Sequence, residues 1–274
     1  QQIQKQHRMS NLVKRAIFGS LYVGLILAAL LLREHLVYMI VFGLLAFLGT
    51  WEWSNLVSTH RLFPLRRIFD ATAAVYLFWA THEIADKGIA YAAFLVPYAG
   101  YLLYILVRSI YSERQAMPTD LAKVIFGQIY VGGFLSIANI FYTDTDTSII
   151  LLTIFVSIWA NDTGAYLAGS TLGPSVSPKK SWEGFVGGLI AAVVATGLLL
   201  GWEQCYIGVI ISIAATWGDL FESMVKRSVG VKDSGNIIPG HGGILDRIDS
   251  LLFTLPFVAF FLWVLYTYQL IHLA

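Results

Sequence analysis

The sequence predicts an all-helical, polytopic integral membrane protein with about nine transmembrane helices. Hydrophobic residues make up 57% of the 274 residues and charged residues only 13%, about half of the roughly 25% that is usual in soluble domains. The mean hydropathy is +0.68. The apolar residues form runs of about 20 residues, which is the length that a helix needs to cross a bilayer.

The predicted spans follow one another with short connections. They lie near residues 12–32, 36–56, 67–83, 88–110, 121–142, 148–169, 184–202, 205–225 and 250–272. The third span is less apolar because it contains Asp70 and ends at His82 and Glu83, and the seventh is short and rich in glycine. Glu34, Glu52, Glu83 and Glu203 fall near predicted membrane interfaces, so we expect them to anchor the ends of spans.

No internal repeat and no Pro/Ser-rich linker divides the chain. We therefore predict a single membrane domain over residues 12–274, with residues 12–83 as an N-terminal helical subdomain and residues 121–274 carrying the functional site. Residues 1–11 lack an apolar core and are predicted to be a cytoplasmic tail, or a remnant of expression ahead of Met9, rather than a signal peptide.

The distribution of basic residues predicts the orientation. Alternation of nine spans places every one of the 18 Lys and Arg residues except Arg33 and Lys87 on the side of the N-terminus. The positive-inside rule then puts the N-terminus in the cytoplasm and the C-terminus outside. A bacterial cytoplasmic membrane fits this pattern.

Two further features limit the classes of function. The net charge of +1 and the lack of a basic stripe with interleaved aromatics argue against a nucleic-acid partner. Cys205 is the one cysteine, which excludes an internal disulfide and a cysteine metal cluster. We expect Cys205 to pack as a small apolar residue.

The stretch from Trp217 to Asp249 crowds charged residues and glycines between two apolar runs. On a helix, Asp219, Glu222, Ser223 and Lys226 would share one face, because their spacing is i, i+3, i+4 and i+7. Asp246, Asp249 and Ser250 repeat the i, i+3, i+4 spacing at the start of the last run. Ionisable groups at such a depth are expensive unless they have partners or a function.

The residue types in this stretch are those of a site for a cation and phosphates. Carboxylate oxygens suit Mg²⁺, which fills its remaining positions with phosphate oxygens and water. Lys and Arg neutralise the charge left on the phosphates. The connecting loop supplies Lys232, Arg247 and His241, the last within a glycine-rich turn where the backbone can approach a ligand closely.

A second polar group lies around the sixth predicted span. Asn161 and Asp162 interrupt its apolar run, and a Ser-Pro-Lys-Lys segment with Lys179 and Lys180 follows at the start of the next helix. A buried Asn-Asp pair indicates a functional site, with a hydrogen bond between helices as the alternative. The predicted topology puts Asp162, Asp219 and Asp246 at similar depth in the cytoplasmic half, so we expect them to converge on one pocket.

Both regions resemble the phosphatidate cytidylyltransferases, also called CDP-diacylglycerol synthases. The first similarity runs Ser223-x-Val225-Lys226-Arg227, Lys232-Asp233-x-Gly235, and Ile238-Pro239-x-His241-Gly242-Gly243-Ile244-x-Asp246-Arg247-Ile248-Asp249. The second runs Asn161-Asp162-Thr163-Gly164-Ala165-Tyr166, then Ser177-Pro178-Lys179-Lys180-x-Trp182-Glu183-Gly184. In this chain Ser170 follows Gly169, where the family often has arginine, and the connection to Ser177 is compact.

The resemblance implies transfer of the cytidylyl group of CTP to phosphatidate, with CDP-diacylglycerol and pyrophosphate as products of phospholipid biosynthesis. It implies Mg²⁺ as cofactor, allows a second cation such as K⁺, and makes a homodimer an expectation. CTP, phosphatidate and membrane lipids are the expected partners, and the active site is expected on the cytoplasmic side.

The motif positions then give each residue a predicted role. The predicted metal ligands are Asp219, Asp246 and Asp162. The predicted catalytic residues are Asp219, Asp246, Lys226, Arg227 and Asp249. The predicted substrate-binding residues are Asn161, Asp162, Lys179, Lys180, Ser223, Lys232, His241 and Arg247. Asp162 and Asp249 have a structural alternative, a salt bridge with Arg247 or Lys226.

Two other functions remain open from the sequence. A CTP-dependent polyprenol or phytol kinase could share the layout of metal and nucleotide but would transfer the γ-phosphate. An ion-coupled transporter with intramembrane acids is the rival from another class, and it leaves the Lys-rich glycine loop unexplained.

Overall fold

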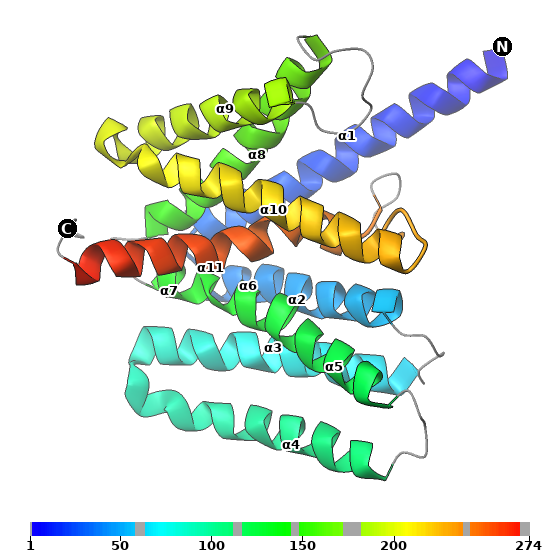
Figure 1. Ribbon diagram of the computed structural model, residues 1–274, viewed down its shortest axis with the longest axis vertical. Helices are drawn as coiled ribbons and strands as arrows, with labels where there is room; N and C mark the ends of the chain where they lie inside the picture. The colour runs from blue at the N-terminus through cyan, green and yellow to red at the C-terminus, as the bar shows by residue number, and fades with distance from the viewer. Residues whose placement is uncertain are drawn as a thin grey trace. The chain divides into compact units, whose positions relative to one another are not determined.

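The computed structural model describes residues 2–57, 64–111, 117–143, 148–171, 182–237 and 242–268. All the regular secondary structure in these residues is helical, as Figure 1 shows. The chain forms two compact units: residues 1–139 with 222–248, and residues 140–221 with 249–274. Helices α10 (Tyr206–Ser228) and α11 (Leu245–Thr267) contribute to both units.

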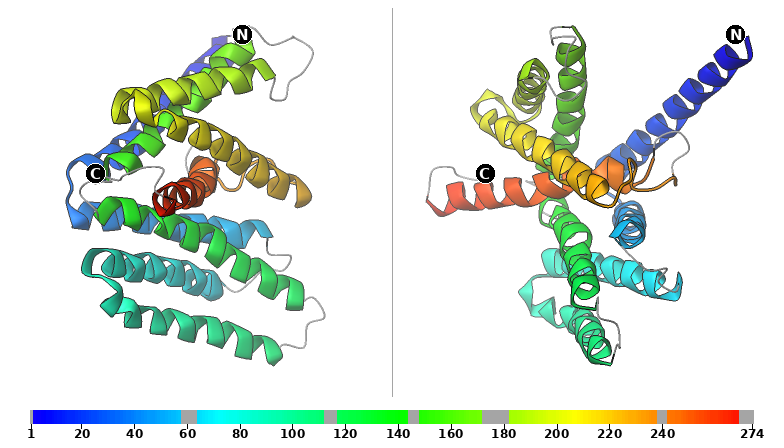
Figure 2. Two further views of the ribbon diagram at one scale, coloured as in Figure 1. Left: turned by 60° about the vertical axis from the view of Figure 1, so that its left-hand side comes forward. Right: turned by 45° about the vertical axis from the view of Figure 1, so that its right-hand side comes forward.

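The first unit is built mainly from the N-terminal half of the chain. Its helices are α1 (Gln2–Leu31), α2 (His35–Val57), α3 (Pro64–Lys87), η1 (Ile89–Leu95), α4 (Val96–Ile110), α5 (Met117–Gly127), η2 (Gln128–Gly133) and α6 (Phe134–Ser136). Helix α2 packs on α3, and α4 packs on α5. Figure 2 shows α2, α3 and α4 side by side.

The second unit contains α8 (Ser148–Thr171), α9 (Trp182–Leu200) and η3 (Trp202–Gln204), and α7 (Ala138–Thr143) leads into it. Helices α8 and α9 form a tight antiparallel pair (Figure 2). Gly164 and Gly187 permit this approach, since a Cβ on Gly164 would lie 2.6 Å from the carbonyl oxygen of Gly187. Ser157 and Thr196 share a hydrogen bond of 2.9 Å across the pair.

Seven helices of the described residues are long and apolar enough to cross a membrane. They are His35–Val57, Ile89–Ile110, Thr119–Thr143, Ser148–Thr171, Trp182–Leu200, Tyr206–Ser228 and Leu245–Thr267. The structure thus confirms an all-helical, multi-pass protein. Of the other two predicted spans, 12–32 overlaps α1 up to Leu31 and 67–83 falls within α3. The count of nine and the orientation of the termini stay predictions.

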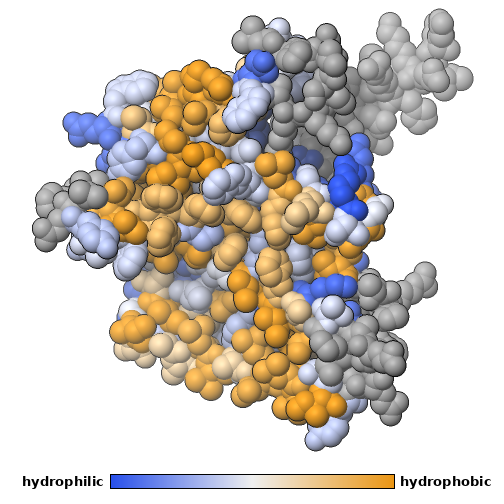
Figure 3. Space-filling model, viewed as in Figure 1, coloured by the Kyte–Doolittle hydropathy of each residue, from blue (hydrophilic) through white to orange (hydrophobic). Residues whose placement is uncertain are grey.

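Large apolar side chains are exposed on the surface, where contact with water would be unfavourable. On α4, Leu103, Val107 and Ile110 are 61%, 51% and 74% exposed, and Figure 3 shows orange, apolar surface over this helix. A hydrocarbon environment suits such side chains, and a helix pairs the backbone groups of its interior within itself. These surfaces therefore fit contact with lipid.

Helix α3 holds its acid by burying it among hydrogen-bond donors. Asp70 is only 3% exposed, and its Oδ1 accepts a hydrogen bond of 2.7 Å from the Tyr101 hydroxyl on α4. The Gln128 amide donates to the Asp70 backbone carbonyl at 2.8 Å. Arg66 Nε lies 3.9 Å from the other carboxylate oxygen, Oδ2. Because buried polar groups need partners, Tyr101 and Arg66 explain how an acid fits inside the third predicted span.

Candidate active site

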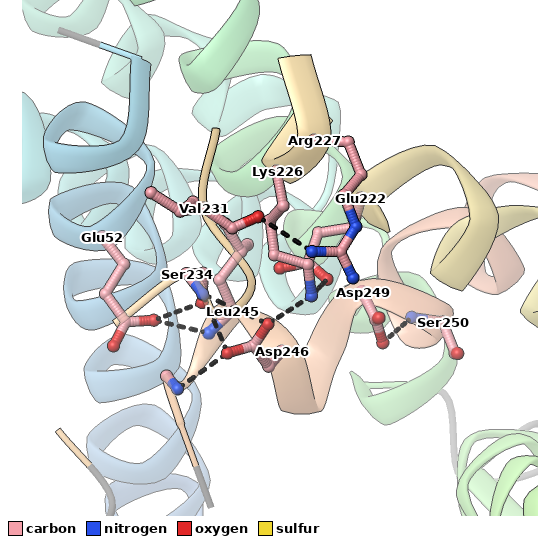
Figure 4. A network of polar contacts seen from close by, with 11 residues as sticks. Glu52, Glu222, Lys226, Arg227, Val231, Ser234, Leu245, Asp246, Asp249 and Ser250 are labelled. Atoms are coloured by element: carbon pink, nitrogen blue, oxygen red, sulfur yellow. Dashed lines mark hydrogen bonds and ion pairs between the residues drawn. The ribbon is translucent and has the colours of Figure 1, made fainter. Parts of the chain in front are cut away.

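The carboxylate of Asp246 is held by two backbone N–H groups of the loop between α10 and α11. It accepts hydrogen bonds from Gly243 N at 2.8 Å and from Ser234 N at 3.0 Å (Figure 4). Asp246 lies in the first turn of α11, where the helix dipole favours negative charge. The loop is therefore folded around the carboxylate of Asp246.

Lys226 bridges two acids of the first unit. Its ammonium group lies 2.5 Å from Asp246 Oδ1 and 2.6 Å from Glu222 Oε2. Glu222 and Lys226 meet because they are one turn apart on α10. The Lys226 side chain is 11% exposed and that of Glu222 is 0% exposed, so the three charges form a buried network in which Lys226 is the shared partner.

Glu52, from α2, reaches the same loop and corrects one sequence-based expectation. It was expected to anchor the end of a span, but it is 1% exposed and accepts a hydrogen bond of 2.8 Å from Leu245 N (Figure 4). Its contacts lie almost two hundred residues away in the chain, so helical spacing could not have revealed them. In the sequence, the only indication of this role is a glutamate near the end of an otherwise apolar span.

The glycines of the loop are required by the close approach of the carboxylates. Gly242 has φ +83°, a conformation that favours glycine, and a Cβ there would lie 2.8 Å from Asp246 Oδ2. A Cβ on Gly243 would collide with the Glu52 carboxylate and the Ser234 hydroxyl. Side chains at these positions would push the backbone donors away from the acids.

Basic residues of the motif lie at the surface of the loop region. Arg227, Lys232 and Arg247 are exposed, and the Arg227 guanidinium donates a hydrogen bond of 3.3 Å to the Val231 carbonyl. Exposed cations beside a fixed acid are available to phosphate oxygens. Ser223 is half-buried on α10, while the predicted residues Lys179, Lys180 and His241 lie outside the described residues.

The second unit carries the remaining predicted residues. Asn161 is 5% exposed, Asp162 is exposed, and Asp219 is half-buried on α10. Asp249 is 8% exposed, and its Oδ1 accepts a hydrogen bond of 2.6 Å from Ser250 N. The structure thus brings Asp246 and Lys226 together in the first unit, and the convergence of Asp162, Asp219 and Asp246 stays a prediction.

Asn161 makes the hydrogen bond between helices that was the alternative to a substrate contact. The Asn161 Oδ1 accepts a hydrogen bond of 2.7 Å from the Ser212 hydroxyl of α10. Gly188 allows α9 to approach Asn161 closely, since a Cβ on Gly188 would lie 2.8 Å from Asn161 Oδ1. A role in binding substrate stays a prediction, but a structural role is established by these contacts.

Replacing Ser212 with alanine tests the structural role without altering Asn161. We expect the free energy of unfolding to fall by about 1–3 kcal/mol, because the buried Asn161 oxygen would lose its donor. The melting temperature in detergent measures this change. The folded variant should keep the activity of the wild-type protein, and a lost activity at an unchanged melting temperature would contradict the structural role.

The donor chemistry of the site suits a hard cation. Carboxylate oxygens are the ligands that Mg²⁺ prefers, and Asp246 and Glu222 already share one positive charge, that of Lys226. Among the residues that the structure describes, no three His, Cys, Asp or Glu side chains are gathered for a metal. A cation at Asp246 would therefore share that carboxylate with Lys226.

Comparison with known proteins identifies the family of the chain. Residues 13–265 match the model of the cytidylyltransferase family. A phosphatidate cytidylyltransferase of Haemophilus influenzae is 34% identical, over 91% of this chain and 98% of its own length. One from Staphylococcus haemolyticus is 34% identical, over 85% and 92%, and one from Mycobacterium tuberculosis is 28% identical, over 88% and 79%. The resemblance carried by the two motifs is therefore confirmed, and the chain belongs to the cytidylyltransferase family.

Proposed function

We propose that this protein transfers the cytidylyl group of CTP to phosphatidate, giving CDP-diacylglycerol and pyrophosphate for phospholipid biosynthesis. The observation that carries the proposal is the region around the loop between α10 and α11, where Asp246 is fixed beside Lys226 and where Arg227 and Lys232 are exposed. This combination of a held acid and exposed cations suits a nucleoside triphosphate, in a chain whose relatives are named for this reaction.

The reaction is an in-line displacement at phosphorus. A phosphate oxygen of phosphatidate attacks the α-phosphorus of CTP, the new P–O–P bond forms, and the bond to the β-phosphate breaks to release pyrophosphate. Both substrates are anionic, so catalysis rests on positioning and on neutralising charge. We assign this work to Arg227 at the end of α10, Lys232 of the loop and Arg247 at the start of α11, together with Lys179, Lys180 and His241.

The cofactor follows from the acids of the motif. Asp246, Asp219 and Asp162 are each proposed as a ligand of Mg²⁺, and a second cation such as K⁺ is part of the proposal. When bound, the cation would polarise the phosphate oxygens. Lys226 orients Asp246 through its ion pair, and the backbone N–H groups of Ser234 and Gly243 keep that carboxylate from rotating.

The site is proposed to face the cytoplasm. CTP is a water-soluble substrate, whereas phosphatidate reaches the protein through the bilayer, so a site at the inner interface serves both. The predicted bias of Lys and Arg toward the same side supports this placement.

Purified protein supplied with radiolabelled CTP, phosphatidate and Mg²⁺ tests the function directly. Label in the α-phosphate should appear in CDP-diacylglycerol, and label in the γ-phosphate should appear in pyrophosphate. EDTA should abolish both products if the cation is required. Label passing from the γ-phosphate to a lipid, with CDP as by-product, would instead show a kinase. Gradient-driven flux in vesicles without CTP turnover would show a transporter.

Replacing Asp219 with asparagine tests the proposed metal ligands. We expect CTP-dependent product formation to fall about 100-fold or more, because a catalytic cation supplies several kcal/mol of stabilisation to the transition state. Radiolabelled product and the melting temperature are measured together. Asp86→Asn, an exposed acid near the end of α3, serves as control. Full activity of the Asp219 variant would refute the assignment.

A further inference from the structure

We propose that Glu52 of α2 is a positioning residue for cytidylyl transfer. It holds the loop whose backbone N–H groups donate hydrogen bonds to Asp246. The inference rests on the proposed function and adds a residue from the N-terminal part of the chain to a site otherwise built from the C-terminal motif. All of the contacts that carry it lie within the first unit.

Glu52 accepts hydrogen bonds from the middle of the loop and from the start of α11. Its Oε2 accepts hydrogen bonds from Leu245 N at 2.8 Å and from the Ser234 hydroxyl at 3.4 Å. Leu245 is the first residue of α11, so its N–H has no partner within the helix. A carboxylate there also interacts favourably with the helix dipole. Glu52 therefore caps α11 from another helix.

The loop is shaped to receive this carboxylate. Gly235 and Gly243 press their backbones against it, and a Cβ added to either residue would lie 2.8 Å from Glu52 Cδ. Only a residue without a side chain lets the backbone come so near. The two glycines thus enclose one end of Glu52, which is 1% exposed.

The same two short segments of the chain donate hydrogen bonds to Asp246 and to Glu52. Ser234 donates its N–H to Asp246 and its hydroxyl to Glu52. Gly243 donates to Asp246, and Leu245, two residues later, donates to Glu52. Figure 4 shows the two carboxylates on either side of these donors. Loss of Glu52 would release the segments that orient Asp246 while leaving Asp246 itself intact.

A glutamate this deeply buried needs compensation for the water that it loses. The hydrogen bonds of Leu245 and Ser234 provide part of it. Groups that orient a catalytic ligand without touching the substrate change activity by roughly 10–100-fold when they are removed. This range separates a positioning residue from a side chain that only fills space.

The test compares Glu52→Ala, Glu52→Gln and the control Glu83→Gln. Glu83 is a glutamate of the same unit that pairs with Lys87 at the end of α3. For each protein, hydrogen–deuterium exchange of the amides of Ser234, Gly243 and Leu245 is measured with the melting temperature. The kcat and KM for CTP are measured on the same preparations.

For Glu52→Ala we expect faster exchange at these three amides, unchanged exchange in α3 and α4, and a kcat lower by roughly 10–100-fold. Glutamine keeps an acceptor oxygen for Leu245 N, so Glu52→Gln should recover most of the kcat and most of the protection. Glu83→Gln should behave as the wild-type protein in all measurements.

Two outcomes overturn the inference. One is unchanged protection of the three amides in Glu52→Ala, and the other is an activity loss accompanied by faster exchange throughout the helices, which would indicate a structural role alone. Failure of the proposed function is distinguishable, since the wild-type protein would then form no CDP-diacylglycerol, whereas the exchange measurement needs no turnover.

Discussion

Replacing Asp246 with asparagine is expected to lower the kcat of cytidylyl transfer by about 1000-fold. Asparagine is nearly the same size and keeps one oxygen to accept from Gly243 N and Ser234 N, so the loop should retain its fold. It carries no charge, however, so it would no longer pair with Lys226 or attract a cation. A loss of several kcal/mol in charge stabilisation corresponds to a factor of this size.

The matched control is Asp120→Asn. Asp120 also lies in the first turn of a helix, α5, and faces a lysine, with Lys123 Nζ at 3.9 Å. Asp120 lies outside both motif regions, so we expect the Asp120→Asn variant to keep the wild-type kcat. Initial rates with radiolabelled CTP and melting temperatures measure both proteins. An Asp246→Asn enzyme within tenfold of the wild-type rate would remove Asp246 from the catalytic residues.

The helices could be predicted well because hydropathy fixes them locally. The run predicted at 36–56 is α2 (His35–Val57), and the run predicted at 148–169 is α8 (Ser148–Thr171). Helix α11 begins at Leu245, five residues before the predicted run at 250. The apolar pattern missed this turn because it contains Asp246 and Asp249, acids that a helix N-terminus accommodates.

The predicted span at 121–142 shows where periodicity is insufficient. The structure forms it from α5, η2, α6 and α7, with a π-helical turn at Gln128–Gly133. Tertiary contacts accompany this change: Gln128 donates to the Asp70 backbone, and Gly127 packs against the indole of Trp53. Such contacts involve residues distant in sequence, so a local hydropathy pattern does not contain them.

The site could be predicted in part for the same physical reason. Glu222 and Lys226 are one helical turn apart, so their ion pair follows from spacing, and the motif indicated Asp246. Glu52 could not be found in this way, because its role arises only when α2 packs against the loop at Leu245. Local spacing identifies residues on one helix face, whereas the partner that holds the loop is a property of the fold.

Replacing Lys226 with methionine is expected to lower the free energy of unfolding by about 3–5 kcal/mol, since removal of one partner leaves buried charge uncompensated. The side chains of Glu222 and Asp246 are 0% and 9% exposed and share this one ammonium group. For a domain somewhat smaller than this chain, each kcal/mol lowers the melting temperature by roughly 2–4 °C. The fall in detergent should therefore be about 10 °C.

Arg227→Met is the matched control, because Arg227 is the next residue of α10 and is exposed. Its stability should stay within about 0.5 kcal/mol of the wild-type protein, although its turnover of CTP should fall if it binds phosphate. Equal melting temperatures for the two variants would show that Lys226 is not the partner of buried charge.

The double variant Glu222→Leu with Lys226→Met distinguishes the contributions of the Glu222 and Asp246 carboxylates to the loss of stability. Leucine removes the fully buried acid together with its partner, and replacing a buried ion pair by apolar residues is often neutral or stabilising. We therefore expect the double variant to melt well above Lys226→Met alone, a non-additivity of the kind that contacting residues show. Asp246 would still lack its lysine, so activity should stay low while stability recovers. If the double variant melts as low as Lys226→Met alone, the charge left on Asp246 rather than that on Glu222 accounts for the instability.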